Sequence, residues 1–208
     1  MTGYAIEELV GIFRLLQQQR WSAILIGGQA VNLYANHYAD QIIDIESYRP
    51  LASRDLDFHG GPVDARRAMS ILNADGKIND GTDPSPNAGV LRVPMQTGDT
   101  LIIDILTSVF GVSASELVRS SKTWNLLGQV EMEVIHPLLL FESKLACLRG
   151  LPQQGRQDRK HVQLMSQVMR AWLAEHLDSP REVYRAIERI AAMMHSSQPR
   201  RSDDSTIK

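Results

Sequence analysis

The chain has 208 residues and a formal net charge of −2, with 43% hydrophobic and 22% charged residues. This is the composition of an ordinary globular protein, long enough to bury a substantial core as one large domain or two small ones. The small net charge excludes a general attraction to nucleic acid or to anionic membranes, so any site for a polyanion must be local.

The first part of the chain predicts helices alternating with strands. Apolar side chains at helical spacing predict an amphipathic helix over residues 4–20. Residues 21–26 predict a buried strand, which Gly27-Gly28 ends in a sharp turn into a helix over residues 29–34. After these we expect an irregular insertion over residues 40–52 and a strand over residues 54–59. The next helix should begin with Gly60-Gly61-Pro62.

Turn-forming residues at 81–87 predict a mobile loop, after which residues 90–94 and 100–107 read as a hairpin joined through 97–99. Residues 130–135 are the last strand candidate. Beyond Pro137 the pattern is helical, over residues 137–149, 158–176 and 180–195, and the polar tail 196–208 is expected to be disordered. The composition therefore indicates an α/β core over 1–136 and a C-terminal helical region over 137–195.

The single cysteine, Cys147, excludes an internal disulfide framework and fits a reducing compartment. Its apolar neighbours in the predicted helix favour a small buried side chain over a reactive one. No apolar run approaches the roughly 18 residues that span a bilayer, and the N-terminus lacks the pattern of a signal peptide. We therefore expect a cytoplasmic protein.

Two aspartates in the predicted strand 54–59 indicate a metal site. Asp55 and Asp57 are two residues apart, and successive side chains of a strand point to opposite faces, so both carboxylates project from the same face. Neighbouring carboxylates raise one another's pKa unless a cation lies between them. Mg²⁺, which is held by one or two carboxylates and substrate phosphates, suits this pair.

Asp104 interrupts an otherwise apolar strand, where a lone carboxylate is costly to bury. It is either an edge-strand residue bonded to a turn or the third carboxylate of the same metal cluster. The glycine pair, Gly27-Gly28, offers backbone N–H groups at a helix N-terminus, which favours phosphate, although such a pair is often only a turn. Together these features predict metal-assisted phosphate chemistry.

The order of these segments resembles the DNA polymerase β-like nucleotidyltransferase superfamily, most closely the abortive-infection (AbiE) type nucleotidyltransferase toxins. The resemblance covers about residues 20–165 and rests on four segments: Gly27-Gly28 after a short strand, Ser53-Arg54-Asp55-Leu56-Asp57-Phe58, Asp104 in a later strand, and the helix containing Lys144 with the Arg156–His161 segment after it.

The resemblance implies an α+β fold, in which a mixed sheet with flanking helices is followed by a helical half. It implies that Asp55, Asp57 and Asp104 are catalytic and bind Mg²⁺, with Asp104 helping to deprotonate the acceptor hydroxyl. It also implies that Gly27, Gly28, Ser53 and Lys144 contact the triphosphate of an NTP, and that Asp158 orients the basic residues. His161 stands where the family has a second acid, and Gln157 where it has a lysine.

Three features of the sequence each have two possible interpretations. His59 is either a further ligand or a hydrogen-bonded residue at the end of its strand. Lys144 is either a phosphate contact or a lysine whose stem covers the core. Residues 144–161 carry five basic side chains against one acidic one, a net charge of +4 that fits triphosphate or RNA but also a solvated helix face.

These observations predict a Mg²⁺-dependent enzyme that transfers NMP from an NTP to a hydroxyl of a tRNA, a protein or a small molecule. The alternatives are a non-catalytic binding or regulatory protein of the same fold, with an antitoxin-like partner, and an α/β protein whose aspartates are purely structural.

Overall fold

The computed structural model describes residues 3–79, 81, 84–126 and 128–195. The chain divides into two compact units, Met1–Ala171 and Trp172–Lys208. The predicted disordered tail, 196–208, and part of the predicted loop 81–87 lie outside the described residues.

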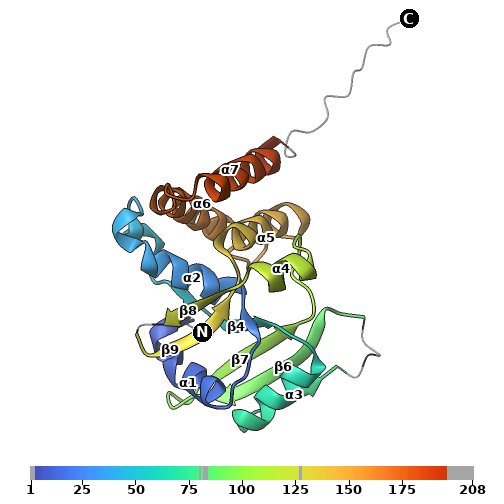
Figure 1. Ribbon diagram of the computed structural model, residues 1–208. Helices are drawn as coiled ribbons and strands as arrows, with labels where there is room; N and C mark the ends of the chain where they lie inside the picture. The colour runs from blue at the N-terminus through green and yellow to red at the C-terminus, as the bar shows by residue number, and fades with distance from the viewer. Residues whose placement is uncertain (1–2, 80, 82–83, 127, 196–208) are drawn as a thin grey trace, which may run out of the picture. The chain divides into compact units, whose positions relative to one another are not determined.

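The first unit is built on a seven-stranded mixed sheet (Figure 1). Across the sheet the strands follow the order β5 (Asp75–Ile78), β6 (Asn87–Pro94), β7 (Thr100–Leu106), β4 (Asp55–His59), β2 (Ile24–Leu25), β9 (Val130–Val134) and β8 (Lys122–Leu126). β4 runs parallel to β7 and β2 parallel to β9, whereas the other neighbours are antiparallel. A separate ladder joins β1 (Tyr4–Ala5) to β3 (Ala52–Ser53).

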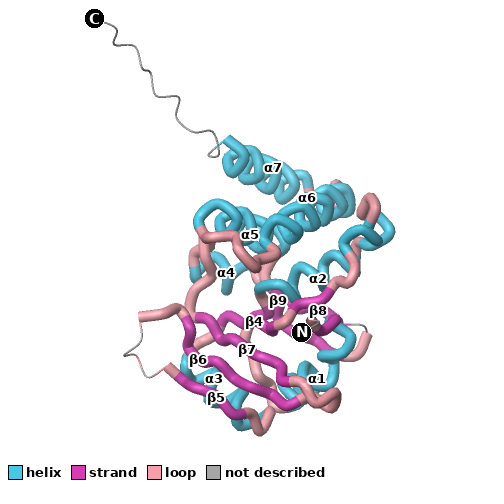
Figure 2. Tube along the Cα trace, turned by 180° about the vertical axis from the view of Figure 1, so that it is seen from behind, coloured by secondary structure: helices cyan, strands magenta, loops and turns pink. Residues whose placement is uncertain are grey.

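Helices cover both faces of this sheet. The two views place α1 (Val10–Gln18) and α3 (Pro62–Ile71) on one face and α2 (Gly27–His37) and α5 (Pro137–Gly150) on the other (Figures 1 and 2). The remaining helices are α4 (Ala114–Ser120), α6 (Asp158–Glu175), α7 (Pro180–His195) and the short 3₁₀ segments η1 (Ile6–Leu9), η2 (Ala39–Gln41) and η3 (Ile45–Tyr48). The predicted fold class, a mixed sheet with flanking helices followed by a helical half, is confirmed.

The alternation of β4 separates the core from the site. Leu56 and Phe58 are fully buried on the α1 side, where Phe58 makes edge contacts with Phe13 at 6.4 Å and with Trp21 at 4.7 Å between ring centroids. Asp55 and Asp57 point to the opposite face, which α2 and α5 cover. One apolar and one acidic set of residues on the same strand thus fix the register of the central sheet.

Polar contacts hold α2 against the rest of the unit. The amide of Gln29, which is fully buried, donates to the backbone oxygen of Tyr4 at 2.9 Å and accepts from Asn32 at 3.2 Å. Further along the helix, the Tyr34 hydroxyl donates to the backbone oxygen of Ile135 at 2.8 Å. Because these groups are buried, losing any one of the bonds leaves a polar atom unpaired, which fixes the N-terminus of α2 in place.

The structure shortens two predicted elements. In place of the predicted helix over 4–20, Tyr4 and Ala5 pair with β3, Ile6–Leu9 form the 3₁₀ segment η1, and the α-helix begins at Val10. The predicted strand over 21–26 contains only Ile24–Leu25, because Trp21 packs on Phe58 and donates its indole N–H to the Asp64 backbone oxygen at 3.0 Å. The predicted hairpin and the three predicted helices after residue 136 are confirmed.

The second unit contains α7 and the end of α6. Within it the Trp172 ring stacks on His176, with centroids 4.3 Å apart. The first unit extends through α5 and most of α6. At the predicted boundary, residue 136, the chain changes from strands to helices. That this point separates two domains stays a prediction. Among the described residues, no helix is both long and apolar enough to cross a bilayer.

Candidate active site

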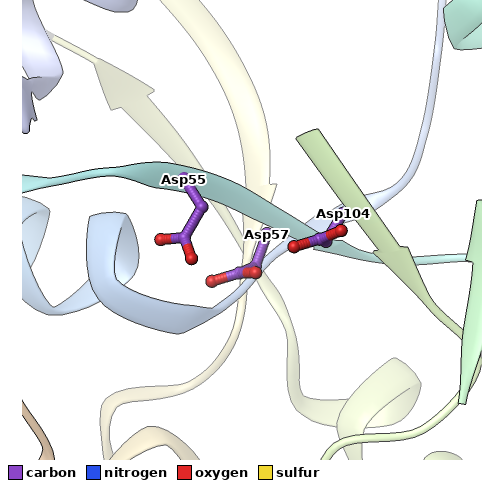
Figure 3. Close-up of side chains that lie close together, drawn as sticks. All are labelled: Asp55, Asp57 and Asp104. Carbon is purple, nitrogen blue, oxygen red and sulfur yellow. The ribbon is translucent and has the colours of Figure 1, made fainter. Parts of the chain in front are cut away.

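Three carboxylates meet at the centre of the sheet. Asp55 and Asp57 come from β4, and Asp104 comes from the neighbouring strand β7, where it lies directly beside Asp57 in the parallel register. One oxygen from each of the three lies within 4.8 Å of the others (Figure 3). Because β7 runs between β4 and β6, Asp104 belongs to an interior strand and not to an edge, which removes one of its two alternative readings.

The cluster is strained electrostatically when it holds no cation. Burial, followed by repulsion from Asp55, raises the pKa of Asp57 to about 7, although Lys144 and the Gly28 N–H act in the opposite direction. Burial and Asp55 also raise the pKa of Asp104. A divalent cation between these oxygens relieves the repulsion, so the residues present fit a hard metal ion such as Mg²⁺.

The glycine pair is packed directly against this cluster. Gly27 has a φ of +70°, and a Cβ at this position would lie 1.9 Å from Oδ2 of Asp57. A Cβ on Gly28 would lie 2.5 Å from Oγ of Ser53, which in turn donates to Oδ1 of Asp55 at 2.8 Å. Neither position has room for a Cβ unless Asp57 or Ser53 moves, and the N-terminus of α2 begins beside the acidic cluster, where the Gly28 N–H is hydrogen-bonded to Asp57.

Basic side chains lie opposite the carboxylates. Lys144, on α5, is 11% exposed, and its Nζ lies 4.0 Å from Oδ1 of Asp158 at the start of α6. Arg156 donates from Nε to the other oxygen of Asp158 at 2.5 Å. The side chain of Asp158 is 3% exposed and lies between the two cations. Lys144 also lines the cavity with the carboxylates, and its charge offsets part of the rise in the pKa of Asp57.

Two histidines lie near the site, and neither belongs to the group of three carboxylates. The imidazole of His161 is buried beside Gly28, and burial together with Lys144 lowers its pKa to about 3. His59 ends β4, and burial lowers its pKa as well. Within the described residues, Nδ1 of each ring is buried without a hydrogen-bond partner.

All the predicted site residues line one cavity of about 600 Å³. This cavity contains Asp55, Asp57, Asp104, Gly27, Gly28, Ser53 and Lys144, together with Asp158 and His161. The structure thus brings these residues together, while the role of each stays a prediction.

Neither a scan against protein-family models nor a search of curated proteins found a match. Among solved structures, the antibiotic-resistance factor ANT(2'')-Ia aligns over 92% of this chain and 95% of its own, with a TM-score of 0.51 and 12% identity. The chain has a nucleotidyltransferase fold. The Megavirus polyadenylate synthase aligns over 81% of this chain and 32% of its own, with a TM-score of 0.45 and 14% identity.

In this nucleotidyltransferase fold the cavity also has lining residues that the sequence did not single out as site residues. These are chiefly Arg54 and the segment Ser108–Phe110, which follows β7. Arg54 lies inside the motif that identified Asp55 and Asp57, so its position was available from the sequence. The loop had no such signal, because it reaches the cavity only through the way it folds against α5.

Proposed function

We propose that this protein is a divalent metal-dependent nucleotidyltransferase that moves NMP from an NTP to a hydroxyl acceptor and releases pyrophosphate. The observation that carries the proposal is the meeting of three carboxylates, a glycine-bounded helix N-terminus and Lys144 in one cavity. Carboxylates alone are common on protein surfaces. Carboxylates on two central strands, facing N–H groups and a buried lysine, supply both a metal site and a phosphate site.

Asp55, Asp57 and Asp104 would hold the metal, with Mg²⁺ as the ion we expect. When bound, the cation neutralises charge on the phosphates and makes the hydroxyl a better nucleophile. Burial and the neighbouring Asp55 raise the pKa of both Asp57 and Asp104, the direction expected for carboxylates that a cation would stabilise.

The triphosphate would lie between the N-terminus of α2 and the basic side chains. The Gly28 N–H and the Ser53 hydroxyl, which donate to Asp57 and Asp55 in the structure, would turn to phosphate oxygens when the cation takes over those carboxylates, and the helix dipole favours the negative charge of the phosphates. On the opposite side Lys144 and Arg156 balance the charge that develops on the leaving pyrophosphate. Asp158 keeps both cations in place while the site is empty of phosphate.

In the reaction, the acceptor oxygen attacks the α-phosphorus, and the bond from that phosphorus to the β-bridging oxygen breaks. The electron pair leaves with pyrophosphate, and the hydroxyl proton passes to Oδ of Asp104. Asp104 suits this role by its position, because it lies on β7 directly beside Asp57 and lines the same cavity as Lys144. Holding both reactants in one cavity supplies much of the remaining acceleration.

The acceptor would be a hydroxyl of a tRNA 3′ end, of a protein side chain or of a small molecule such as an aminoglycoside. The resemblance to AbiE-type toxins adds an antitoxin-like protein as a partner to test, and it leaves the three acceptor classes open. These alternatives are separable by supplying each acceptor in turn with an NTP labelled at the α-phosphate and following the label.

The first test measures thermal stabilisation of the purified protein by each of the four NTPs, with and without Mg²⁺. A ligand that binds only the native state adds about 2.7 kcal/mol at a hundredfold excess over its dissociation constant. We expect a metal-dependent shift in the wild type, and label transfer that falls at least about a hundredfold in Asp57→Asn. The matched control is Asp40→Asn, which removes an exposed aspartate in η2.

Full transfer by a folded Asp57→Asn variant would overturn the proposal. A metal-dependent NTP shift without transfer to any acceptor would instead support the alternative, a non-catalytic binding protein of this fold.

A further inference from the structure

One side of the cavity is apolar and carries an unusually exposed aromatic ring. Phe110 is 50% exposed, although most large hydrophobic side chains of the first unit are buried. It lines the same cavity as the carboxylates and Lys144, with Val109 and Leu151 beside it. An exposed aromatic ring inside a polar site is a feature that core packing does not require.

Two glycines fix the loop that carries this ring against α5. Gly111 has a φ of +79°, and a Cβ there would lie 2.5 Å from Cβ of Ala146. A Cβ on Gly150 would lie 3.0 Å from Cε1 and Cζ of Phe110. An isolated bridge between Val109 and Val112 closes the loop. The edge of the ring is therefore seated on the end of α5, while half of the side chain stays open.

The distance between the ring and the proposed phosphate site is comparable to the length of a nucleotide. Gly150 follows Lys144 by six residues on α5, which corresponds to about 9 Å along the helix axis. Cys147, three residues after Lys144 and on the same side of α5, and Leu151, just past the end of the helix, also line the cavity. This separation is comparable to the distance between the phosphates and the base of an NTP.

We propose that Phe110 is the stacking surface for the nucleobase of the bound NTP. The inference rests on the proposed function, because it assigns the second half of the same substrate. Every base has an aromatic face, so stacking adds affinity with little choice among bases. The apolar neighbours Val109 and Leu151 exclude water from the stacked pair, and Lys144 anchors the phosphates at the other end.

The test compares ligands with and without a base. Binding of ATP, CTP and inorganic tripolyphosphate, each with Mg²⁺, is measured by calorimetry on the wild type, Phe110→Ala, Phe110→Leu and Phe110→Trp. We expect Phe110→Ala and Phe110→Leu to weaken ATP and CTP by about 5- to 100-fold, since a stacked base contributes about 1–3 kcal/mol. Tripolyphosphate affinity should be unchanged, and Phe110→Trp should bind both NTPs at least as tightly as the wild type.

Phe110→Leu keeps an apolar side chain on Gly150, so it guards against a folding defect in Phe110→Ala. Leu15→Ala, on α1 at the other face of the sheet, is the control for loss of an exposed apolar side chain (46% exposed). Equal NTP affinity in wild type and Phe110→Leu would overturn the inference while leaving the proposed function intact. A parallel loss of tripolyphosphate binding would also overturn it, by showing a structural role. Absence of all binding in the wild type would overturn the proposed function itself.

Discussion

At Gly27 a single missing methyl group determines whether the acidic cluster can form. The residue combines a positive φ of +70° with a Cβ position that lies inside the carboxyl group of Asp57. An alanine at this position would therefore have both a strained backbone and a clash with a carboxylate of the cluster. Here neither can relax without moving a proposed metal ligand.

We therefore expect Gly27→Ala to lose metal binding as well as stability. A left-handed backbone costs a non-glycine residue about 1–2 kcal/mol, and the clash displaces Asp57 in addition. The matched control is Gly98→Ala in the β6–β7 turn, where φ is +85° but no heavy atom lies within 4 Å of the added Cβ. Both variants should lose stability in urea unfolding, but only Gly27→Ala should lose affinity for Mg²⁺ and Mg²⁺–NTP in calorimetry. Equal metal affinity in the two variants would show that the cluster tolerates the displacement.

At the scale of elements, the joint between α5 and α6 depends on one buried carboxylate. Asp158, at the first residue of α6, contacts Lys144 of α5 and Arg156 of the connecting segment. Its position at a helix N-terminus adds a favourable interaction with the helix dipole. Without it, Lys144 would be left as a nearly buried charge facing His161 and Arg156.

Replacing this carboxylate should destabilise the protein, and an added anion should restore part of the loss. We expect Asp158→Asn to reduce the free energy of unfolding by about 3 kcal/mol, since it removes one partner of a buried ion pair. Tripolyphosphate should stabilise this variant more than the wild type, because two cations are then free to bind it. The control, Glu46→Gln, breaks the exposed Arg49–Glu46 pair at 2.8 Å and should cost less than about 1 kcal/mol. Similar losses in both variants would contradict a bridging role for Asp158.

The elements that sequence reasoning found are those with strong local signals. β4, β7, α5 and α6 have apolar periodicity, and Pro137 marks the first residue of α5. Several elements were missed, among them the two-residue strands β1 and β3. β5 and β8 are edge strands with largely exposed residues, so they lack an apolar run. α4 did have a signal, since Ser113 caps it by accepting from the Glu116 N–H at 3.3 Å, the spacing of a capping box.

At the scale of the whole molecule, the sequence predicted which residues form the acidic cluster, but not which other side chains line the cavity around it. The spacing of Asp55 and Asp57 predicts a shared face from strand geometry alone, and Asp104 joins them because β7 lies next to β4. Phe110 was not predictable in the same way, since its exposure depends on how the loop folds onto α5. His161 is likewise buried beside Gly28 of α2, a residue far away in sequence, where a Cβ on the glycine would lie 3.6 Å from Cε1 of the ring.

The stability of the whole protein should carry opposite pH signatures from Asp57 and His161. The folded state raises the pKa of Asp57 from 3.8 to about 7, so between these values it binds more protons than the unfolded state. Stability from this group therefore falls as the pH rises from about 4 to 7. The folded state lowers the pKa of His161 from 6.5 to about 3, so between these values the unfolded state binds more protons. Stability from this group therefore rises as the pH increases from about 3 to 6.5.

Difference curves separate the two effects. Urea unfolding is measured in steps between about pH 4 and pH 7, with a chelator present, for the wild type, Asp57→Asn and His161→Asn. The free energy of unfolding of the wild type minus that of Asp57→Asn should fall with pH, and the wild type minus His161→Asn should rise, each by at most about 1.4 kcal/mol per pH unit. Saturating Mg²⁺ should remove the first slope, because the cation favours the ionised carboxylate, and should leave the second. Parallel curves for all three proteins would mean that neither group titrates differently on folding. A first slope that survives Mg²⁺ would place the cation somewhere other than the three aspartates.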